Sequence, residues 1–220
     1  MSDVMTQGRA WLTEKKGWVV QTTRPDIPNL SDEVTVIWKD SRGITHEQLR
    51  KAWALMTEIA AFQGQSKEET YGEQQAIFTL KHLETLQDGL FHLSTATVST
   101  ARAFITMLIE TILEYGIPTK EPLYGLCDDL VKYTYACLMN KKCAVCGRKT
   151  ELHHVDAVGM GRNRKEINHI GMRALPLCLD HHEEAHSIGN TSFLGKYHLE
   201  PIPIDERIAK KYNLKMEEQA

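Results

Sequence analysis

The chain has 220 residues, enough for one large domain or two modest ones. Hydrophobic residues make up 42% and charged residues 25% of it, ordinary values that argue against a disordered chain, a collagen and a coiled coil. The net charge of −3 alone argues against nucleic acid as a partner.

The sequence indicates a soluble protein of the cytoplasm, without a membrane segment. Its longest mainly apolar stretch, residues 101–113, is interrupted by Arg102 and Glu110 and is shorter than the ~18–20 residues of a membrane span. Residues 1–4 have neither the basic nor the apolar region of a signal peptide. The cysteine count of five is odd, which favours a reducing compartment over a secreted disulfide framework.

Strands are predicted first along the chain, and helices after them. Residues 18–23 and 33–38 are rich in β-branched and aromatic residues, and the turn-forming residues 24–29 lie between them. The pattern then changes to helical spacing, with capping-box signatures that begin at Thr45 and Ser66. The four helices are expected at about residues 45–63, 66–86, 101–115 and 122–139.

The apolar faces of these helices predict a core. We expect Trp53, Phe104 and the methionines to face it, because helical apolar stripes usually do. Cys127 and Cys137, placed in the fourth helix, are expected to be ordinary buried thiols. Around residue 140 the composition changes to Cys, His, Gly and Arg. The predicted fold is therefore α+β, with a strand-and-helix domain over residues 1–140 and a small metal-containing domain over residues 141–220.

Two pairs of possible metal ligands follow the predicted boundary. Cys143 and Cys146 form a C-x-x-C pair, and Cys178 and His181 form a C-x-x-H pair about 30 residues later. Two such pairs suit a tetrahedral structural zinc with three thiolates and one imidazole, because each tight turn supplies two ligands. Zinc would also compensate for the small apolar core of this segment. The alternative is a set of unconnected core cysteines.

A second set of histidines is interleaved with the first. Seven of the ten histidines lie within residues 153–198. His182 and His186 are four residues apart, so on a helix they point from one face and can chelate an ion. The short apolar stretch 174–177 before them predicts a strand, and residues 187–190 are expected to end the helix.

Positive charge is concentrated around these residues. Residues 141–173 contain eight basic and three acidic side chains, a net +5, whereas residues 1–135 carry −5. A local patch attracts phosphate even on an acidic chain, because the Debye length near physiological salt is only ~8 Å. The candidate contacts to a nucleic-acid backbone are Lys141, Lys142, Arg162, Arg164 and Lys165. A solvated loop is the alternative.

Residues 143–189 resemble the HNH (ββα-metal) nucleases, most closely those of bacteriophages. The resemblance rests on Glu-Leu-His-His at 151–154, on His-x-x-x-His at 182–186 and on the cysteines that bracket both. It implies that a catalytic divalent ion is bound by His153, His182 and His186. It also implies that His154 is the general base and that Glu151 orients a neighbouring side chain.

One residue departs from the pattern of this family. Arg173 stands where the family has an Asn that fixes the loop carrying the base. Asn168 or His169 could take over this structural role. Equally, Arg173 could bind the scissile phosphate, so we include it among the candidate catalytic residues.

Residues 33–118 have a weaker resemblance to the Orf (NinB-like) recombination mediators of lambdoid phages. It rests on residues 44–53 and on residues 94–99 before the third predicted helix. Those mediators bind single-stranded DNA, associate with single-strand-binding protein and are dimeric, so the resemblance implies these partners and a homodimer. Any αβ domain with capped amphipathic helices would share much of the pattern. The acidic balance of this half favours protein docking or dimerisation over a strong DNA face.

The leading hypothesis is a metal-dependent DNA endonuclease of phage recombination or replication, acting in the bacterial host cell on single-stranded or branched DNA. It implies a structural Zn²⁺ and one catalytic divalent cation, Mg²⁺, Mn²⁺, Ni²⁺ or Zn²⁺, and imidazole ligands disfavour Mg²⁺. Little sequence preference is expected, because phosphate contacts do not read bases. The alternatives are a non-catalytic zinc-containing DNA-binding recombination mediator and an RNA or small-molecule phosphodiesterase.

Overall fold

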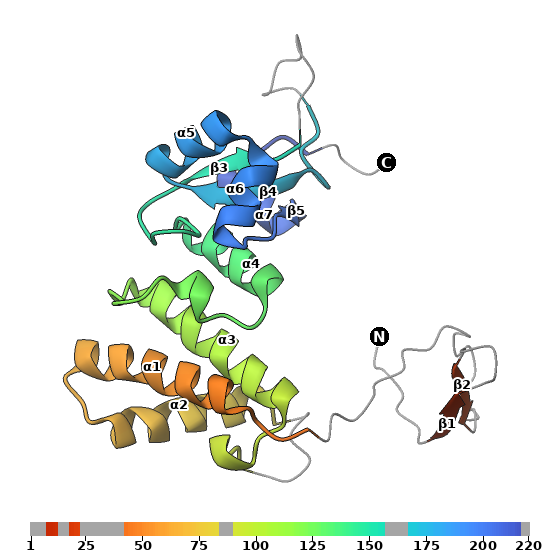
Figure 1. Cartoon of the computed structure of the whole chain (residues 1–220), viewed down its shortest axis with the longest axis vertical. Coiled ribbons are helices and arrows are strands. Elements are labelled where there is room, and N and C mark those ends of the chain that lie inside the picture. The colour runs from red at the N-terminus through yellow and green to blue at the C-terminus, as the bar shows by residue number, and fades with distance from the viewer. Residues whose placement is uncertain (1–7, 13–17, 23–41, 84–89, 157–166, 217–220) are drawn as a thin grey trace. The chain divides into compact units, whose positions relative to one another are not determined.

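The computed structural model describes residues 8–12, 18–22, 42–83, 90–156 and 167–216, which belong to two units. The first unit contributes an antiparallel pair of strands, β1 (Gly8–Leu12) and β2 (Trp18–Thr22) (Figure 1). β2 confirms the strand predicted at residues 18–23, and β1 has no counterpart among the predicted strands. The strand predicted at residues 33–38 and the turn before it lie outside the described residues.

The second unit, residues 40–220, combines helices with a three-stranded sheet and confirms the predicted α+β fold. Its α-helices are α1 (His46–Gln63), α2 (Lys67–Lys81), α3 (Val98–Tyr115), α4 (Leu130–Asn140), α5 (Leu179–Ile188), α6 (Asn190–Tyr197) and α7 (Glu206–Tyr212). The antiparallel strands are β3 (Glu151–His154), β4 (Arg173–Leu177) and β5 (Ile202–Pro203), in the order β3-β4-β5. Short 3₁₀ helices span Leu93–Thr95 and Leu123–Gly125. None of the helices within the described residues is long and apolar enough to cross a membrane.

Both predicted capping boxes are present, at the starts of α1 and α2. In the first, the Thr45 hydroxyl accepts a hydrogen bond from the backbone N–H of Gln48, and the Gln48 side chain accepts one from the backbone N–H of Thr45. The buried Gln48 amide also donates to Asp128 at 2.9 Å and to the carbonyl of Val98 at 3.1 Å. Lys51 donates to the other Asp128 oxygen at 2.8 Å. These bonds tie α1 to the start of α3 and to the turn before α4.

Two helix bounds differ from the prediction. α2 ends at Lys81 rather than near residue 86, because the next residue, His82, leaves the helical conformation with φ −122° and ψ 19°. α4 begins at Leu130 rather than at residue 122, because the Asp129 side chain caps it by accepting a hydrogen bond from the backbone N–H of Lys132. The residues before Asp129 form a separate 3₁₀ turn instead.

The predicted core residues are buried to different degrees. Phe104 is completely buried, whereas Trp53 is half-buried and packs on Tyr71 with ring centroids 5.6 Å apart. Cys137 lies in α4 and is completely buried. Cys127 lies in the turn before α4 rather than within the helix, because the helix begins later than predicted. Its thiol is half-buried, and burial raises its pKa to about 11.

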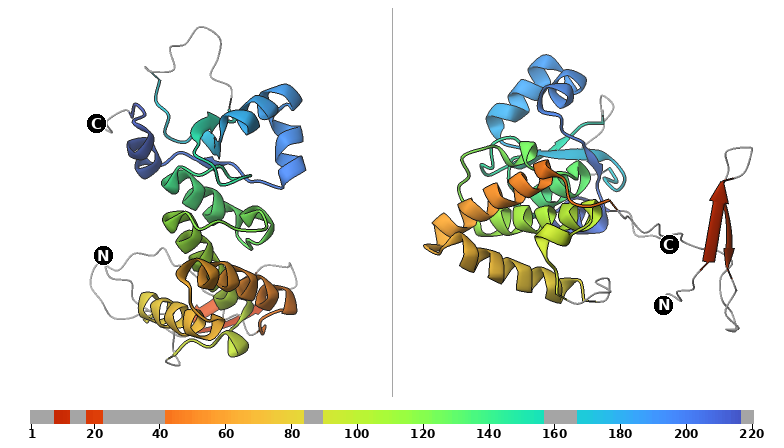
Figure 2. Two further views of the ribbon diagram at one scale, coloured as in Figure 1. Left: turned by 90° about the vertical axis from the view of Figure 1, so that its left-hand side faces the viewer. Right: turned by 60° about the horizontal axis from the view of Figure 1, so that its bottom comes forward.

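α4 connects the helices to the sheet. α1 packs on α2 and on α3 (Figure 2), and α4 contacts α3 as well as β4, β5 and α7 (Figure 1). One core therefore runs from Ala52 in α1 to Leu199 after α6 and includes Cys143 and Cys178. A second core contains Leu138, Ala174, Ile202, Ile204, Ile208 and Ala209. Because α4 contributes to both cores, the sheet and the predicted metal ligands beside it rest directly on the helices. The domain division at residue 140 remains a prediction.

Candidate metal centres and active site

β4 and α5 are the predicted strand and helix, and β3 carries the Glu-Leu-His-His residues of the family resemblance. β3 pairs antiparallel with β4, so that His153 lies opposite Leu175 and His154 opposite Ala174. Side chains alternate along a strand, so His153 and His154 point to opposite faces of the sheet. β4 leads directly into α5 through Cys178, the N-cap residue of that helix. The strand pair and the helix therefore bring together ligand candidates from two distant parts of the sequence.

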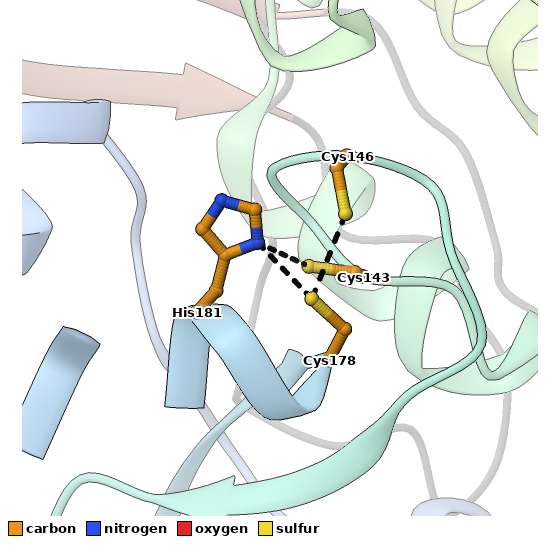
Figure 3. A group of neighbouring side chains, drawn as sticks. All are labelled: Cys143, Cys146, Cys178 and His181. Carbon is orange, nitrogen blue, oxygen red and sulfur yellow. Dashed lines mark hydrogen bonds between the residues drawn. The ribbon is translucent and has the colours of Figure 1, made fainter. Parts of the chain in front are cut away.

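The four predicted zinc ligands converge, with their side chains pointing toward one another (Figure 3). His181 Nδ1 lies 3.5 Å from Cys143 Sγ and 3.2 Å from Cys178 Sγ. The sulfur atoms of Cys146 and Cys178 are 3.7 Å apart. With Zn–S of about 2.3 Å and Zn–N of about 2.0–2.1 Å, a tetrahedral zinc separates two sulfurs by about 3.8 Å and sulfur from nitrogen by about 3.5 Å. These donors therefore fit zinc.

The loop that begins at Cys143 is a tight knuckle. Gly147 has φ of 70°, a left-handed conformation that suits glycine. Its N–H donates to the carbonyl of Cys143 at 2.8 Å, and the N–H of Cys143 donates to the carbonyl of Arg148 at 2.7 Å. The N–H of Ala144 donates to the carbonyl of Pro176 at 2.9 Å, which joins the knuckle to β4. The backbone thus positions the first ligand pair beside the second.

Arg148 places a positive charge against the sulfur atoms of Cys146 and Cys178. Its Nε donates to Cys146 Sγ at 3.3 Å and its Nη2 donates to Cys178 Sγ at 3.4 Å. Nη2 also pairs with Asp180 at 2.6 Å. Although burial opposes the shift, hydrogen bonds from Arg148 lower the pKa of Cys146. Burial lowers the pKa of His181, which favours the neutral imidazole that a metal requires.

Arg148→Met is expected to weaken zinc retention by about 10–100-fold, the usual effect of losing a hydrogen-bonding partner of a metal ligand. The guanidinium offsets the net negative charge that three thiolates leave on a zinc site. The measurement is the rate of zinc transfer to a chromogenic chelator. Lys149→Met, a change at the exposed neighbouring residue, is the control and should release zinc at the wild-type rate. Equal rates in the two variants would contradict this role of Arg148.

His153, His182 and His186 form a second cluster, with side-chain nitrogens within 4.8 Å of one another. The ring of His153 lies 4.7 Å from that of His182 and 5.2 Å from that of His186, and the two helix rings are 4.7 Å apart. His153 is buried, His182 is half-buried and His186 is exposed. Three imidazoles that meet near the surface can bind one divalent ion and leave further positions open to water and substrate.

His154 contacts another histidine, His169. Its Nε2 lies 2.9 Å from His169 Nδ1, and the ring centroids are 4.9 Å apart. His169 is buried, and its backbone N–H donates to the carbonyl of Lys215 at 3.3 Å while its carbonyl accepts from Met172 at 3.2 Å. A buried, anchored partner restricts the orientation of the His154 ring. Asn168, the other residue considered for the family's Asn role, is exposed, and its side chain accepts a local backbone hydrogen bond.

Arg173 pairs with Asp156, two residues after His154. The backbone N–H of Arg173 donates to Asp156 at 2.7 Å, and its Nε and Nη2 donate at 2.9 and 2.6 Å. These hydrogen bonds hold the pKa of Asp156 below its usual range. The pair joins the start of β4 to the segment after β3. Glu151 is exposed at the start of β3. Its backbone carbonyl accepts a hydrogen bond from the Thr150 hydroxyl at 2.7 Å, and its carboxylate makes no hydrogen bond to another described residue.

The structure describes only some of the residues predicted to contact a nucleic-acid backbone. Lys141 ends α4 in a left-handed conformation, with Nζ 5.3 Å from the centroid of the Tyr212 ring. Lys142 is half-buried and forms a β-bridge with Lys149. Arg162, Arg164 and Lys165 lie outside the described residues.

Asn190 is a site residue that the sequence motifs do not include. Its Oδ1 lies 3.0 Å from His153 Nε2, and its Nδ2 donates to the carbonyl of Val155 at 2.9 Å. The Gly189-Asn190 pair indicates a helix end, and that signal alone would not connect Asn190 with a strand 37 positions earlier. Asp156 was missed for a similar reason, since its partner Arg173 is 17 positions away.

Comparison with known proteins identifies the family. A family model described as "Putative HNHc nuclease" matches residues 21–217. No curated protein and no solved structure gives a significant match. The N-terminal resemblance to recombination mediators therefore has no support from these comparisons, and the nuclease model covers all of residues 33–118 as well. With this match and the strand–strand–helix arrangement around two ligand clusters, the chain belongs to the HNH nuclease family.

Proposed function

We propose that this protein is a metal-dependent DNA endonuclease that hydrolyses phosphodiester bonds with little sequence preference. The observation that carries the proposal is the convergence of His153, His182 and His186 on β3 and α5, with His154 directly after His153 in the chain. A four-ligand Cys/His cluster has no open position and suits a structural role, whereas a three-imidazole cluster leaves room for substrate. The two clusters thus support two different metal roles.

His154 is the proposed general base. An imidazole can take a proton from a water molecule as that water attacks the phosphorus. The bond from phosphorus to the 3′ oxygen then breaks. His169 restricts the orientation of the His154 ring, and the Arg173–Asp156 pair braces the segment that follows it. We assign Arg173 this bracing role in preference to phosphate binding, because its guanidinium is already occupied by Asp156.

The residues of the second cluster suit an ion that accepts nitrogen ligands. Zn²⁺, Ni²⁺ and Mn²⁺ bind three imidazoles more readily than Mg²⁺, which prefers oxygen. When bound, such an ion supplies electrostatic stabilisation of the charge that develops on the phosphate and 3′ oxygens. We propose that Glu151 orients a neighbouring side chain at the start of β3, and that Cys143, Cys146, Cys178 and His181 hold a structural Zn²⁺.

The family implies DNA as the substrate, and we propose phosphate contacts from Lys141, Lys142, Arg162, Arg164 and Lys165. Such contacts position a backbone without reading bases. A preference for single-stranded or branched DNA and a role in phage recombination are finer proposals, and they depend on the N-terminal resemblance alone. A single-strand-binding partner and a homodimer have no further support.

The test is a cleavage assay of the purified chain on supercoiled, single-stranded and branched DNA, with each of Mg²⁺, Mn²⁺, Ni²⁺ and Zn²⁺. Total metal is measured on the same sample. The proposal is supported if cleavage requires an added ion and if the chain retains about one zinc when no ion is added. Retained zinc and DNA binding without cleavage under any ion would instead show a non-catalytic binding module. Faster hydrolysis of RNA or of a model diester would change the substrate class.

A further inference from the structure

Asn190 contacts both neighbours of the proposed base. Its amide nitrogen Nδ2 donates to the carbonyl of Val155 at 2.9 Å, directly after His154 in the chain. Its Oδ1 lies 3.0 Å from Nε2 of His153, directly before His154. Asn190 is half-buried and is the first residue of α6, which follows α5 after the single residue Gly189. One amide therefore bridges the end of β3 to the junction of the two helices.

The chemistry of the amide fixes the tautomer of His153. The group facing the Val155 carbonyl must be the NH₂, because a carbonyl oxygen only accepts. Oδ1 then faces His153, so His153 Nε2 must carry a hydrogen and donate it. Nδ1 is left as the nitrogen with a lone pair for a metal ion. Metal-binding histidines commonly have their second nitrogen held in this way.

We infer that Asn190 is a positioning residue of the proposed active site, holding the proposed metal ligand His153 and the segment of the base His154 with one side chain. Arg173 stands at the position before α5 where the family has its loop-fixing Asn. Here an Asn amide fixes the same segment from the far end of α5. This inference rests on the proposed function for the role of His154, but its consequence for metal binding does not.

Two substitutions distinguish the effects of the two Asn190 contacts. Asn190→Leu removes both contacts, so Ni²⁺ affinity should fall about 10–100-fold and cleavage should fall with it. Asn190→Asp keeps an acceptor for His153 but places an oxygen against the Val155 carbonyl. Ni²⁺ affinity should then equal or exceed that of the wild type, while kcat should fall about tenfold or more because the base segment shifts. A merely structural role would not separate affinity from kcat in this way.

The experiment uses the full chain with its zinc retained, titrated with Ni²⁺ in a calorimeter and assayed for DNA cleavage. Thr191→Ala, at the exposed next residue of α6, is the matched control and should behave as wild type. His182→Ala should abolish the Ni²⁺ signal and so assign it to the three-histidine cluster. If Asn190→Leu does not fold, Asn190→Ser, too short to bridge both contacts, takes its place.

The inference would be overturned if the Asn190→Leu or Asn190→Ser variant bound Ni²⁺ with an affinity within threefold of that of Thr191→Ala. This margin is well inside the expected loss of affinity. Parallel losses of Ni²⁺ affinity and kcat in Asn190→Asp would also overturn it. A wild-type chain that binds Ni²⁺ but cleaves no DNA would refute the proposed function instead. In that case the affinity comparison still decides whether Asn190 positions His153.

Discussion

His154→Ala is expected to lower the rate of DNA cleavage by about 10²–10⁴-fold, the usual contribution of a positioned general base. The substitution removes an imidazole that points away from the face of β3 that carries His153. The three-histidine cluster should therefore keep its ion. DNA affinity should also stay within about twofold of wild type, because phosphate contacts come from lysine and arginine side chains.

Single-turnover cleavage with saturating ion measures this loss, and fluorescence anisotropy with labelled DNA measures binding. His198→Asn is the matched histidine control. His198 is exposed at the end of α6 with φ of 50°, a left-handed conformation that Asn tolerates better than Ala does. The control should cleave at the wild-type rate. Cleavage by His154→Ala at more than about a tenth of the wild-type rate would contradict the assignment of the base.

The ligand clusters could be predicted because each pair of ligands is local in sequence. Cys143 and Cys146 share one turn, and His182 and His186 share one helix face, so spacing alone restricts their geometry. What spacing cannot provide is the distance between pairs. The structure supplies it through the antiparallel pairing of β3 with β4, which brings His153 to α5.

The supporting contacts could not be predicted, because they join residues of common types over long separations. Asn190 reaches His153 across 37 positions, and His169 reaches His154 across 15. Neither pair has a spacing that a motif could specify. The expectation that Asn168 or His169 replaces the family's Asn included His169, which contacts His154, but it did not include the amide at the other end of α5.

The start of α4 could not be predicted from the sequence for a similar reason. Asp128 and Asp129 are adjacent, and either could cap a helix. Asp128 instead binds Lys51 and Gln48 of α1, which leaves Asp129 as the cap. Apolar spacing that begins at residue 122 predicts a longer helix, because it contains no information on these tertiary contacts.

Cys178→Ser is expected to abolish zinc retention, lower the unfolding temperature by about 10 °C and reduce cleavage to background. Losing a structural metal is among the most destabilising single changes, and about 1 kcal/mol corresponds to about 2–4 °C in a chain of this size. Cys178 is also the N-cap residue of α5, in which His181 of the Cys/His cluster is followed directly by His182 of the three-histidine cluster. Zinc at the Cys/His cluster would therefore hold the helix that supplies two of the three imidazoles of the proposed catalytic site.

Zinc content and thermal unfolding are measured beside Cys127→Ser and His186→Ala. Cys127 lies outside both clusters, and its thiol donates to the carbonyl of Tyr124, a bond that serine can keep. That control should retain zinc, stability and cleavage. His186→Ala should lose cleavage while retaining zinc, because only the three-histidine cluster is changed. If Cys178→Ser kept full cleavage after losing its zinc, α5 would be positioned by packing alone, and the Cys/His cluster would not support the active site.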